Sequence, residues 1–236
     1  HPLYNRIPKD EPLDTNTLLD LILKLPSLES IRFAGGEPFI MPEVEEFLNT
    51  LIQQGKTNIS ISFITNCTSA KPRLVSILEH FKKVNIICSI DGVEDTIEYQ
   101  RYPAKWPIIE NNFKRLYHSK IQSVSIGPCI GMLNYLTLDK LFEWAADYPN
   151  AFISYDEIYN PSFLNFRYIP VSARTEFYEN FSAIDLTHAN QKWQQFKQTT
   201  MYETLEPSID DCTMLYRYVT RIWDTNCKYK FLFKRY

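Results

Sequence analysis

Residues 58–92 read NISISFITNCTSAKPRLVSILEHFKKVNIICSIDG and contain one complete strand–helix–strand unit. Apolar residues alternate with small or polar ones in Asn58–Ile64 and in Val84–Ile90, and this period of two is typical of β-strands. Between them, Pro72 begins a segment with apolar residues at helical spacing, because proline is favoured in the first turn of a helix. Two strands joined by a helix form a parallel pair with a right-handed crossover.

The same alternation of strands and helices continues along most of the chain. Further strands are predicted at Ser30–Ala34, Gln122–Ile130 and Phe152–Ile158. Further helices are predicted at Asp14–Leu25 and in segments that begin at Pro42, Pro107 and Thr137. This regular order predicts the α/β class with a parallel sheet.

One face of several predicted strands is small and polar. Ser60 and Ser62 share such a face, as do Asn85 and Ser89, whereas Cys88 falls on the opposite, apolar face. Fully buried parallel strands normally read as continuous Val, Ile and Leu, and the inside of a closed barrel is filled with bulky branched residues. The pattern therefore favours an open, partial parallel β/α barrel with a polar lumen over an ordinary doubly wound sheet.

Composition excludes several classes of protein. The chain has 236 residues, 44% hydrophobic and 22% charged, as in soluble globular proteins. A net charge of −3 without a Lys/Arg tract argues against a nucleic-acid partner. No apolar run could cross a bilayer and residues 1–20 do not resemble a signal peptide, so we expect no membrane partner and a cytoplasmic location. Five widely spaced cysteines without a Cys-x-x-Cys pair argue against a disulfide framework.

Chemically suggestive residues follow the predicted strands, where ligands sit in parallel α/β folds. Gly35-Gly36-Glu37-Pro38 follows the first strand, and two glycines let a backbone approach a ligand closely. The Glu37 carboxylate could accept hydrogen bonds from an ammonium group. The next strand ends carry Asn66, then Ser89 with Asp91-Gly92, then Gly127-Pro128-Cys129. Taken alone, Gly35–Pro38 or Asp91-Gly92 could also be an ordinary turn.

These strand ends resemble a known superfamily. Residues 33–41, FAGGEPFIM, resemble the Gly-Gly-Glu motif of radical S-adenosylmethionine (SAM) enzymes, and Ile64–Thr68 is similar to their next strand end. Ser89–Gly92 and Tyr99–Pro103 are similar to a later segment of the same enzymes. The chain most resembles the twitch-domain-containing branch, which is related to the SPASM maturases. The likeness covers most of residues 18–170.

The resemblance implies a SAM site. Its methionine moiety would be bound by Gly35, Gly36, Glu37 and Pro38, and its ribose or carboxylate end by Asn66, Ser89 and Asp91. Arg101 would pair with the SAM carboxylate, and the adenine would lie near Gly127 and Asn134. We expect Arg32 to pair with an acid at the barrel mouth rather than to stand alone in the lumen.

The iron ligands of such enzymes are missing from the sequence. The superfamily holds a 4Fe-4S cluster with three cysteines, Cys-x-x-x-Cys-x-x-Cys, after the first barrel strand, and neither that loop nor that strand is present. Cys67, Cys88 and Cys129 lie too far apart to replace it, and Cys212 and Cys227 are too few for an auxiliary cluster. We expect a sequence cut from a longer protein, or its ordered part, in preference to a chain that has lost the cluster.

The sequence thus predicts a partial barrel over 1–170 and a mainly helical, twitch-like extension over 171–236. The leading hypothesis is a radical SAM enzyme that uses an electron donor and a 5′-deoxyadenosyl radical to abstract hydrogen, and the resemblance implies a peptide or protein substrate. A second is a non-catalytic SAM- or nucleotide-binding, or structural, module of a larger assembly. An aldolase-like barrel is disfavoured because no strand-end lysine or paired catalytic carboxylates occur.

Overall fold

The computed structural model describes residues 15–25, 27–181 and 214. Most of the mainly helical extension predicted over 171–236 lies outside these residues. Within the described part, no helix combines the length and the apolar character needed to span a membrane.

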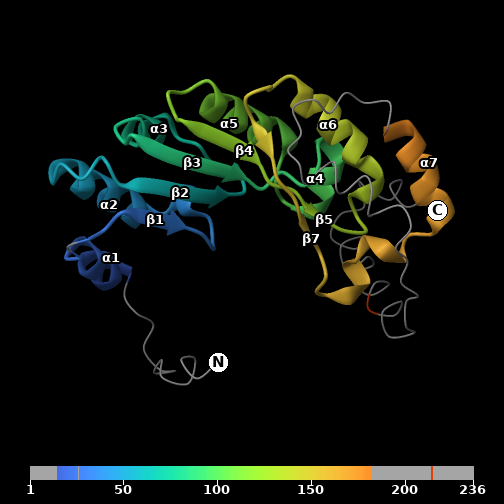
Figure 1. Cartoon of the computed structure of the whole chain (residues 1–236), viewed down its shortest axis with the longest axis horizontal. Helices are drawn as coiled ribbons and strands as arrows, with labels where there is room; N and C mark the ends of the chain where they lie inside the picture. The colour runs from blue at the N-terminus through green and yellow to red at the C-terminus, as the bar shows by residue number, and fades with distance from the viewer. Residues whose placement is uncertain (1–14, 26, 182–213, 215–236) are drawn as a thin grey trace.

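A parallel sheet of five strands forms the centre of the molecule, in the order β1-β2-β3-β4-β6. The strands are β1 (Ser30–Phe33), β2 (Ser60–Thr65), β3 (Lys83–Cys88), β4 (Ser123–Ile126) and β6 (Phe152–Ile153). Every neighbouring pair in this sheet is parallel, which confirms the predicted α/β class. Figure 1 shows that the sheet bends into an arc that is open on one side.

Helices alternate with the strands as predicted. They are α1 (Thr15–Leu23), α2 (Pro42–Gln53), α3 (Pro72–Leu78), α4 (Glu94–Gln100), α5 (Trp106–Tyr117), α6 (Leu138–Ala146) and α7 (Val171–Phe181). Proline occupies the first turn of α2, α3 and α5, where its missing N–H has no intrahelical partner to lose. Helices α3, α5 and α6 lie along the outer side of the arc (Figure 1). Helix α4 was not predicted.

The two faces of the sheet differ as the strand pattern predicted. Ile61 and Phe63 of β2 are fully buried towards the helices, whereas Ser60 and Ser62 on the opposite face are half-buried. Strand β3 repeats this alternation, and Cys88 is fully buried on the helix side. The chain therefore forms an open barrel wall with a polar concave face.

Two predicted strands are each broken in the middle. Gln122–Ile130 forms β4 and then β5 (Cys129–Ile130), and Phe152–Ile158 forms β6 and then β7 (Asp156–Glu157). Strands β5 and β7 leave the main sheet and pair with each other in parallel. The break between β4 and β5 falls at Gly127-Pro128, because proline offers no N–H to a strand ladder and is found at strand ends and bulges.

Candidate functional site

The loop after β1 is open to approach by a ligand. Gly35 and Gly36 have φ angles of 89° and 58°, in the left-handed region that favours glycine. Both residues are exposed, and a Cβ placed on either would meet no atom within 4 Å. The backbone of this loop is consequently open to solvent. The sequence predicts a ligand that approaches it closely, and no side chain stands in the way of one.

Glu37 joins the ends of the first two strands. Its Oε1 accepts hydrogen bonds from Phe39 N at 3.1 Å and from Thr65 Oγ1 at 2.7 Å, and its Oε2 accepts one from Asn66 N at 2.7 Å. The residue is only 8% exposed. A carboxylate has about four acceptor positions, so Oε2 has room for one more donor. Pro38, which follows it, is buried at the start of the 3-10 helix η2 (Pro38–Ile40).

Asn66 and Ser89 lie at adjacent strand ends. Asn66 Oδ1 accepts from both the N–H and the hydroxyl of Thr68, at 2.9 and 2.7 Å, which fixes the turn after β2. The Ser89 N–H donates to Thr65 O at 2.8 Å, so the end of β3 lies beside the end of β2. Both side chains are half-buried. Two of the predicted site residues therefore flank the same part of the lumen.

The buried thiols between these residues are structural. Cys67 and Cys88 are both fully buried, and Cys67 O accepts a hydrogen bond from Asn112 Nδ2 at 2.9 Å. Burial, together with the neighbouring Cys67 and Glu37, raises the pKa of the Cys88 thiol well above its ordinary value. Cys88 is consequently held as a neutral thiol, and that these cysteines do not bind a cluster stays a prediction.

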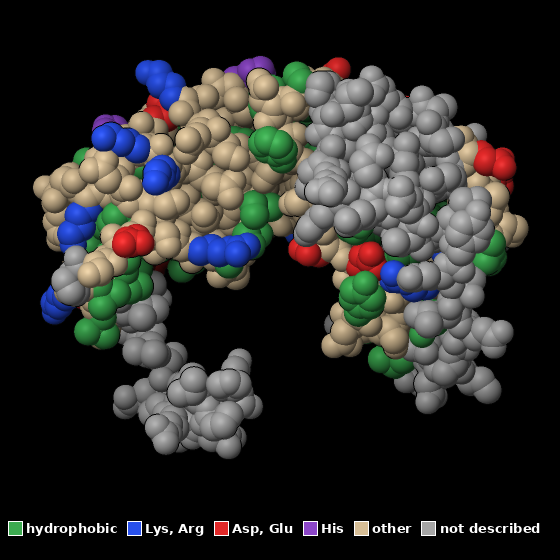
Figure 2. Space-filling view, viewed as in Figure 1, with side chains coloured by type: hydrophobic (Ala, Val, Ile, Leu, Met, Phe, Trp, Pro, Cys, Tyr) green, Lys and Arg blue, Asp and Glu red, His purple; other side chains and the backbone are tan. Residues whose placement is uncertain are grey.

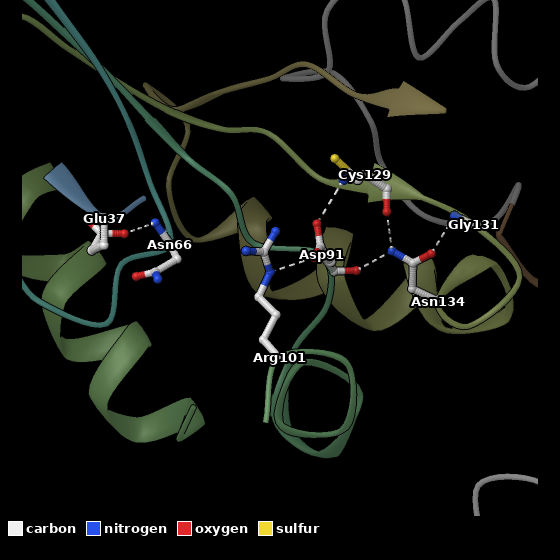
Figure 3. Close-up of polar contacts among 7 residues, drawn as sticks. All are labelled: Glu37, Asn66, Asp91, Arg101, Cys129, Gly131 and Asn134. Carbon is white, nitrogen blue, oxygen red and sulfur yellow. Dashed lines mark hydrogen bonds and ion pairs between the residues drawn. The ribbon is translucent and has the colours of Figure 1, made fainter. Parts of the chain in front are cut away.

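Asp91 holds three parts of the chain together (Figure 3). Its Oδ2 pairs with Arg101 Nε at 2.6 Å and its Oδ1 accepts from Cys129 N at 2.8 Å, while its carbonyl accepts from Asn134 Nδ2 at 2.7 Å. The side chain is 8% exposed. Each carboxylate oxygen has one protein partner and room for another donor, so Asp91 positions Arg101, and the ribose contact expected of it stays a prediction.

Arg101 presents a guanidinium to the site. Burial lowers its pKa, but the adjacent Asp91 carboxylate outweighs this effect and raises the pKa above its ordinary value. Only Nε bonds to Asp91, and within the described residues the two Nη atoms have no hydrogen-bond partner. The side chain is 29% exposed, so a fixed, charged donor pair is available to an anionic group.

Asn134 is a structural residue at the far side of the site. It is 1% exposed, and its Nδ2 donates to Asp91 O and, at 2.9 Å, to Cys129 O. Its Oδ1 accepts from Gly131 N at 2.8 Å, so the side chain amide is fully engaged.

At Gly131 an added Cβ would come within 2.8 Å of both Leu164 O and Ile158 Cδ1. The predicted Gly127 is constrained in the same way, since its Cβ would lie 2.7 Å from Ile87 Cγ2.

A cavity of about 280 Å³ lies between these groups. Gln100 and Arg101 form its polar side, and Met132, Leu133, Ile158 and Leu164 form an apolar side. Apart from Arg101, the sequence did not single out these residues, because their segments lie beyond the strand ends and carry no motif. The arrangement suits a ligand with an apolar ring system and an anionic end.

The predicted site residues form two groups, and of these residues Asp91, Arg101 and Asn134 line the cavity. Glu37 and Asn66 lie on one side and Asp91, Cys129 and Asn134 on the other, with Arg101 between them (Figure 3). The negative charge of Glu37 acts on Arg101, which places the two groups within electrostatic reach of each other.

Two further sequence expectations concern charge and metal. Arg32 is exposed on the edge strand and makes no ion pair with any described residue, contrary to the expected pairing, because no acid faces it there. Among the described residues no group of three or more His, Cys, Asp or Glu side chains could hold a metal ion. Cys129 is exposed as a residue, but its thiol is partly buried. This burial raises the pKa of the thiol, and the negative charge of Asp91 raises it further.

No protein-family profile and no curated protein sequence matches the chain. Several solved structures share its fold. One, native anSMEcpe with bound AdoMet (another abbreviation of SAM), is 16% identical with a TM-score of 0.53 over 71% of this chain and 49% of that one. Native anSMEcpe with AdoMet and Cp18Cys peptide is 14% identical, with a TM-score of 0.52 over 80% of this chain and 53% of that one. A histidine-tagged form with AdoMet is 14% identical, with a TM-score of 0.54 over 86% of this chain and 55% of that one. The chain spans about half the length of these proteins.

Proposed function

We propose that the chain is the SAM-binding barrel of a radical SAM enzyme, which would use a 5′-deoxyadenosyl radical to abstract hydrogen from its substrate. The proposal is carried by Arg101, whose two Nη atoms have no hydrogen-bond partner among the described residues and bring a positive charge to a cavity with an apolar wall. The fold that this chain shares with anSMEcpe, a radical SAM enzyme, supports it.

The described residues fit the organic part of SAM. The bare Gly35-Gly36 backbone and the remaining acceptor position of Glu37 suit the methionine amino group. The free Nη atoms of Arg101 suit its carboxylate, and Asn66 and Ser89 suit the ribose hydroxyls. The adenine would lie against the apolar wall of the cavity, beyond Gly127 and Asn134. SAM supplies the adenosyl group of the reaction, and these residues bind and orient it.

The described residues do not fit a 4Fe-4S cluster. They contain no set of cysteine ligands, and Cys67 and Cys88 are buried as thiols away from the lumen. Cluster ligands and a docking site for an electron donor belong to other parts of a longer polypeptide under this proposal, and no step of radical formation follows from the residues described. The free thiols of Cys67, Cys88 and Cys129 agree with a reducing, cytoplasmic setting.

A peptide or protein is the substrate class that we propose. Some solved structures of similar fold contain a bound peptide as well as AdoMet. In this chain the open concave face, lined by half-buried serine and asparagine side chains, leaves room for an extended segment beside the SAM site.

A second candidate is a SAM- or nucleotide-binding module without catalysis, working in a larger assembly. The absence of cluster ligands among the described residues favours it. Anaerobic reconstitution of the intact polypeptide with iron and sulfide, followed by an assay for 5′-deoxyadenosine, distinguishes the two. Product formation supports the enzyme, and a polypeptide that binds SAM without forming a cluster supports the module.

Calorimetric titration of this chain tests the binding site directly. We expect SAM to bind more tightly than 5′-methylthioadenosine, which lacks the carboxylate that Arg101 would hold. An Arg101→Ala variant should lose about tenfold or more in SAM affinity, as a charge-assisted contact is removed, and bind methylthioadenosine unchanged.

Lys105→Ala is the matched control, because it removes a nearby, more exposed cation that pairs with Glu98 and does not line the cavity. Its SAM affinity should equal that of the wild type. If Arg101→Ala binds SAM as tightly as the wild type, or if the wild type binds neither compound, the assignment of the site is wrong.

A further inference from the structure

Cations without an ion pair gather at one end of the described fold. These are Lys24, Lys56, Lys82, Lys83 and Lys120, whereas Arg32, also without an ion pair to a described residue, lies one residue before the carboxyl end of β1. Elsewhere, carboxylates pair with Arg73, Arg101, Lys105, Lys114 and Arg167. Among the remaining cations, Lys71 and Lys140 are exposed without an ion pair, and Arg115 donates to Ala70 O. The segregation is visible in Figure 2, where Lys and Arg side chains cluster over the part labelled α2, α3 and β1–β3 in Figure 1.

The loops that carry these lysines are adjacent. Lys56 Nζ donates to Leu23 O at 2.8 Å, and Lys82 N donates to Thr57 O at 3.1 Å. Lys120 N donates to Glu79 Oε1 at 3.0 Å. Each loop precedes one strand of the sheet, and adjacent strands of a sheet lie roughly 5 Å apart, so the loops that carry the lysines are neighbours. They form a continuous row along the amino-terminal ends of β1 to β4, which we call the amino-terminal basic surface.

Few acids interrupt this surface. Glu29, Glu79 and Asp147 lie in the same loops and Asp20 lies one helical turn before Lys24, while Glu79 is already bonded to the backbone of Lys120. The surface is consequently positive although the whole chain has a net charge of −3. A local positive field on an acidic protein is the arrangement that steers a partner of opposite charge to one face.

The neighbouring side chains favour a polypeptide over a nucleic acid. Leu21 and Leu25, beside Lys24, are 53% and 52% exposed and offer apolar contacts. Successive bases of a single-stranded nucleic acid stack on several exposed rings, whereas Phe81 and Tyr148 at this end are each only 6% exposed and Phe152, the first residue of β6, is the one described Phe, Tyr or Trp here that is exposed, at 63%.

We propose that the amino-terminal basic surface binds an acidic polypeptide segment that also carries apolar side chains. The lysines would meet its carboxylates, and Leu21 and Leu25 would contact its apolar residues. This surface lies at the opposite ends of the strands from Glu37, Asp91 and Arg101, so the proposal does not depend on SAM binding.

Fluorescence anisotropy with a short labelled peptide of alternating glutamate and leucine tests the proposal. The wild-type chain should bind it with an affinity that falls as salt is raised. The charge-reversed double variant Lys82→Glu/Lys83→Glu should bind at least about tenfold more weakly, because two attractive contacts become repulsive.

The double variant Lys71→Glu/Lys140→Glu is the matched control, since it changes the net charge equally at exposed, unpaired lysines elsewhere. It should bind the peptide as the wild type does, and circular dichroism confirms that both variants are folded. Equal weakening in the two variants would reduce the effect to net charge and overturn the proposal. Tighter binding of a labelled oligothymidylate than of the peptide would overturn the choice of partner.

Discussion

Replacing Glu37 by alanine should destabilise the barrel itself. The substitution removes the acceptor of three hydrogen bonds, those from Phe39 N, Thr65 Oγ1 and Asn66 N, at a site that is 8% exposed. Each donor left without a partner costs about 1 to 3 kcal/mol. Asn66 N is only part-buried and water can reach it, so we expect a total near 4 kcal/mol in the free energy of unfolding.

Thermal unfolding followed by circular dichroism measures this loss. For a chain of this size, about 4 kcal/mol lowers the unfolding midpoint by about 8 to 16 °C. Glu37→Gln should lose less, because it retains an oxygen for Phe39 and Thr65 but sets its amide group against the N–H of Asn66. Glu46→Ala, an exposed glutamate on α2, should be neutral. A midpoint for Glu37→Ala within about 2 °C of the wild type would refute the reasoning. Because Glu37→Ala mixes folding with binding, Arg101→Ala is the better test of SAM contact.

Two further substitutions test the walls of the site. Gly131→Ala should lower the free energy of unfolding by about 1 to 3 kcal/mol, because its Cβ would collide with the backbone oxygen of Leu164, and equal denaturant midpoints would contradict this contact. Asp156→Asn should lower the pKa of Cys129, since Asp156 raises it and losing a neighbouring negative charge favours the thiolate. Alkylation of Cys129 followed by mass spectrometry should then begin at lower pH in the variant, and an unshifted pH profile would show that the two side chains do not interact.

The fold could be predicted because strand and helix periods differ so clearly in this chain. Residues such as Ser60 and Ile61 alternate, and this alone placed them on opposite faces of β2. Helix α4 was missed because its seven residues directly follow the turn at Asp91-Gly92, too short a segment to show a helical stripe. The break at Gly127-Pro128 was missed because apolar residues continue on both sides of it.

The sequence predicted which site residues lie close together only where those residues follow adjacent strand ends. Glu37 and Asn66 were placed correctly beside each other because adjacent parallel strands end at the same edge. That the adenine lies near Asn134 stays a prediction, whereas the structure shows that the amide of Asn134 bonds to Asp91, forty-three positions away. Sequence spacing cannot reveal such a partner, and the cavity wall at Leu164 depends on the same kind of long-range packing.

The departure of β5 and β7 from the main sheet divides the barrel wall along a seam. Near the site, a hydrogen bond from Cys129 N to Asp91 Oδ1 at 2.8 Å links β5 to the residues that follow β3. The other oxygen of the same carboxylate holds Arg101. The side chain of Asp91 therefore links the position of Arg101 to that of β5, and its carbonyl adds a bond from Asn134. A ligand that draws Arg101 towards itself would pull on β5 through Asp91, so we expect ligand binding and the position of this strand to be coupled.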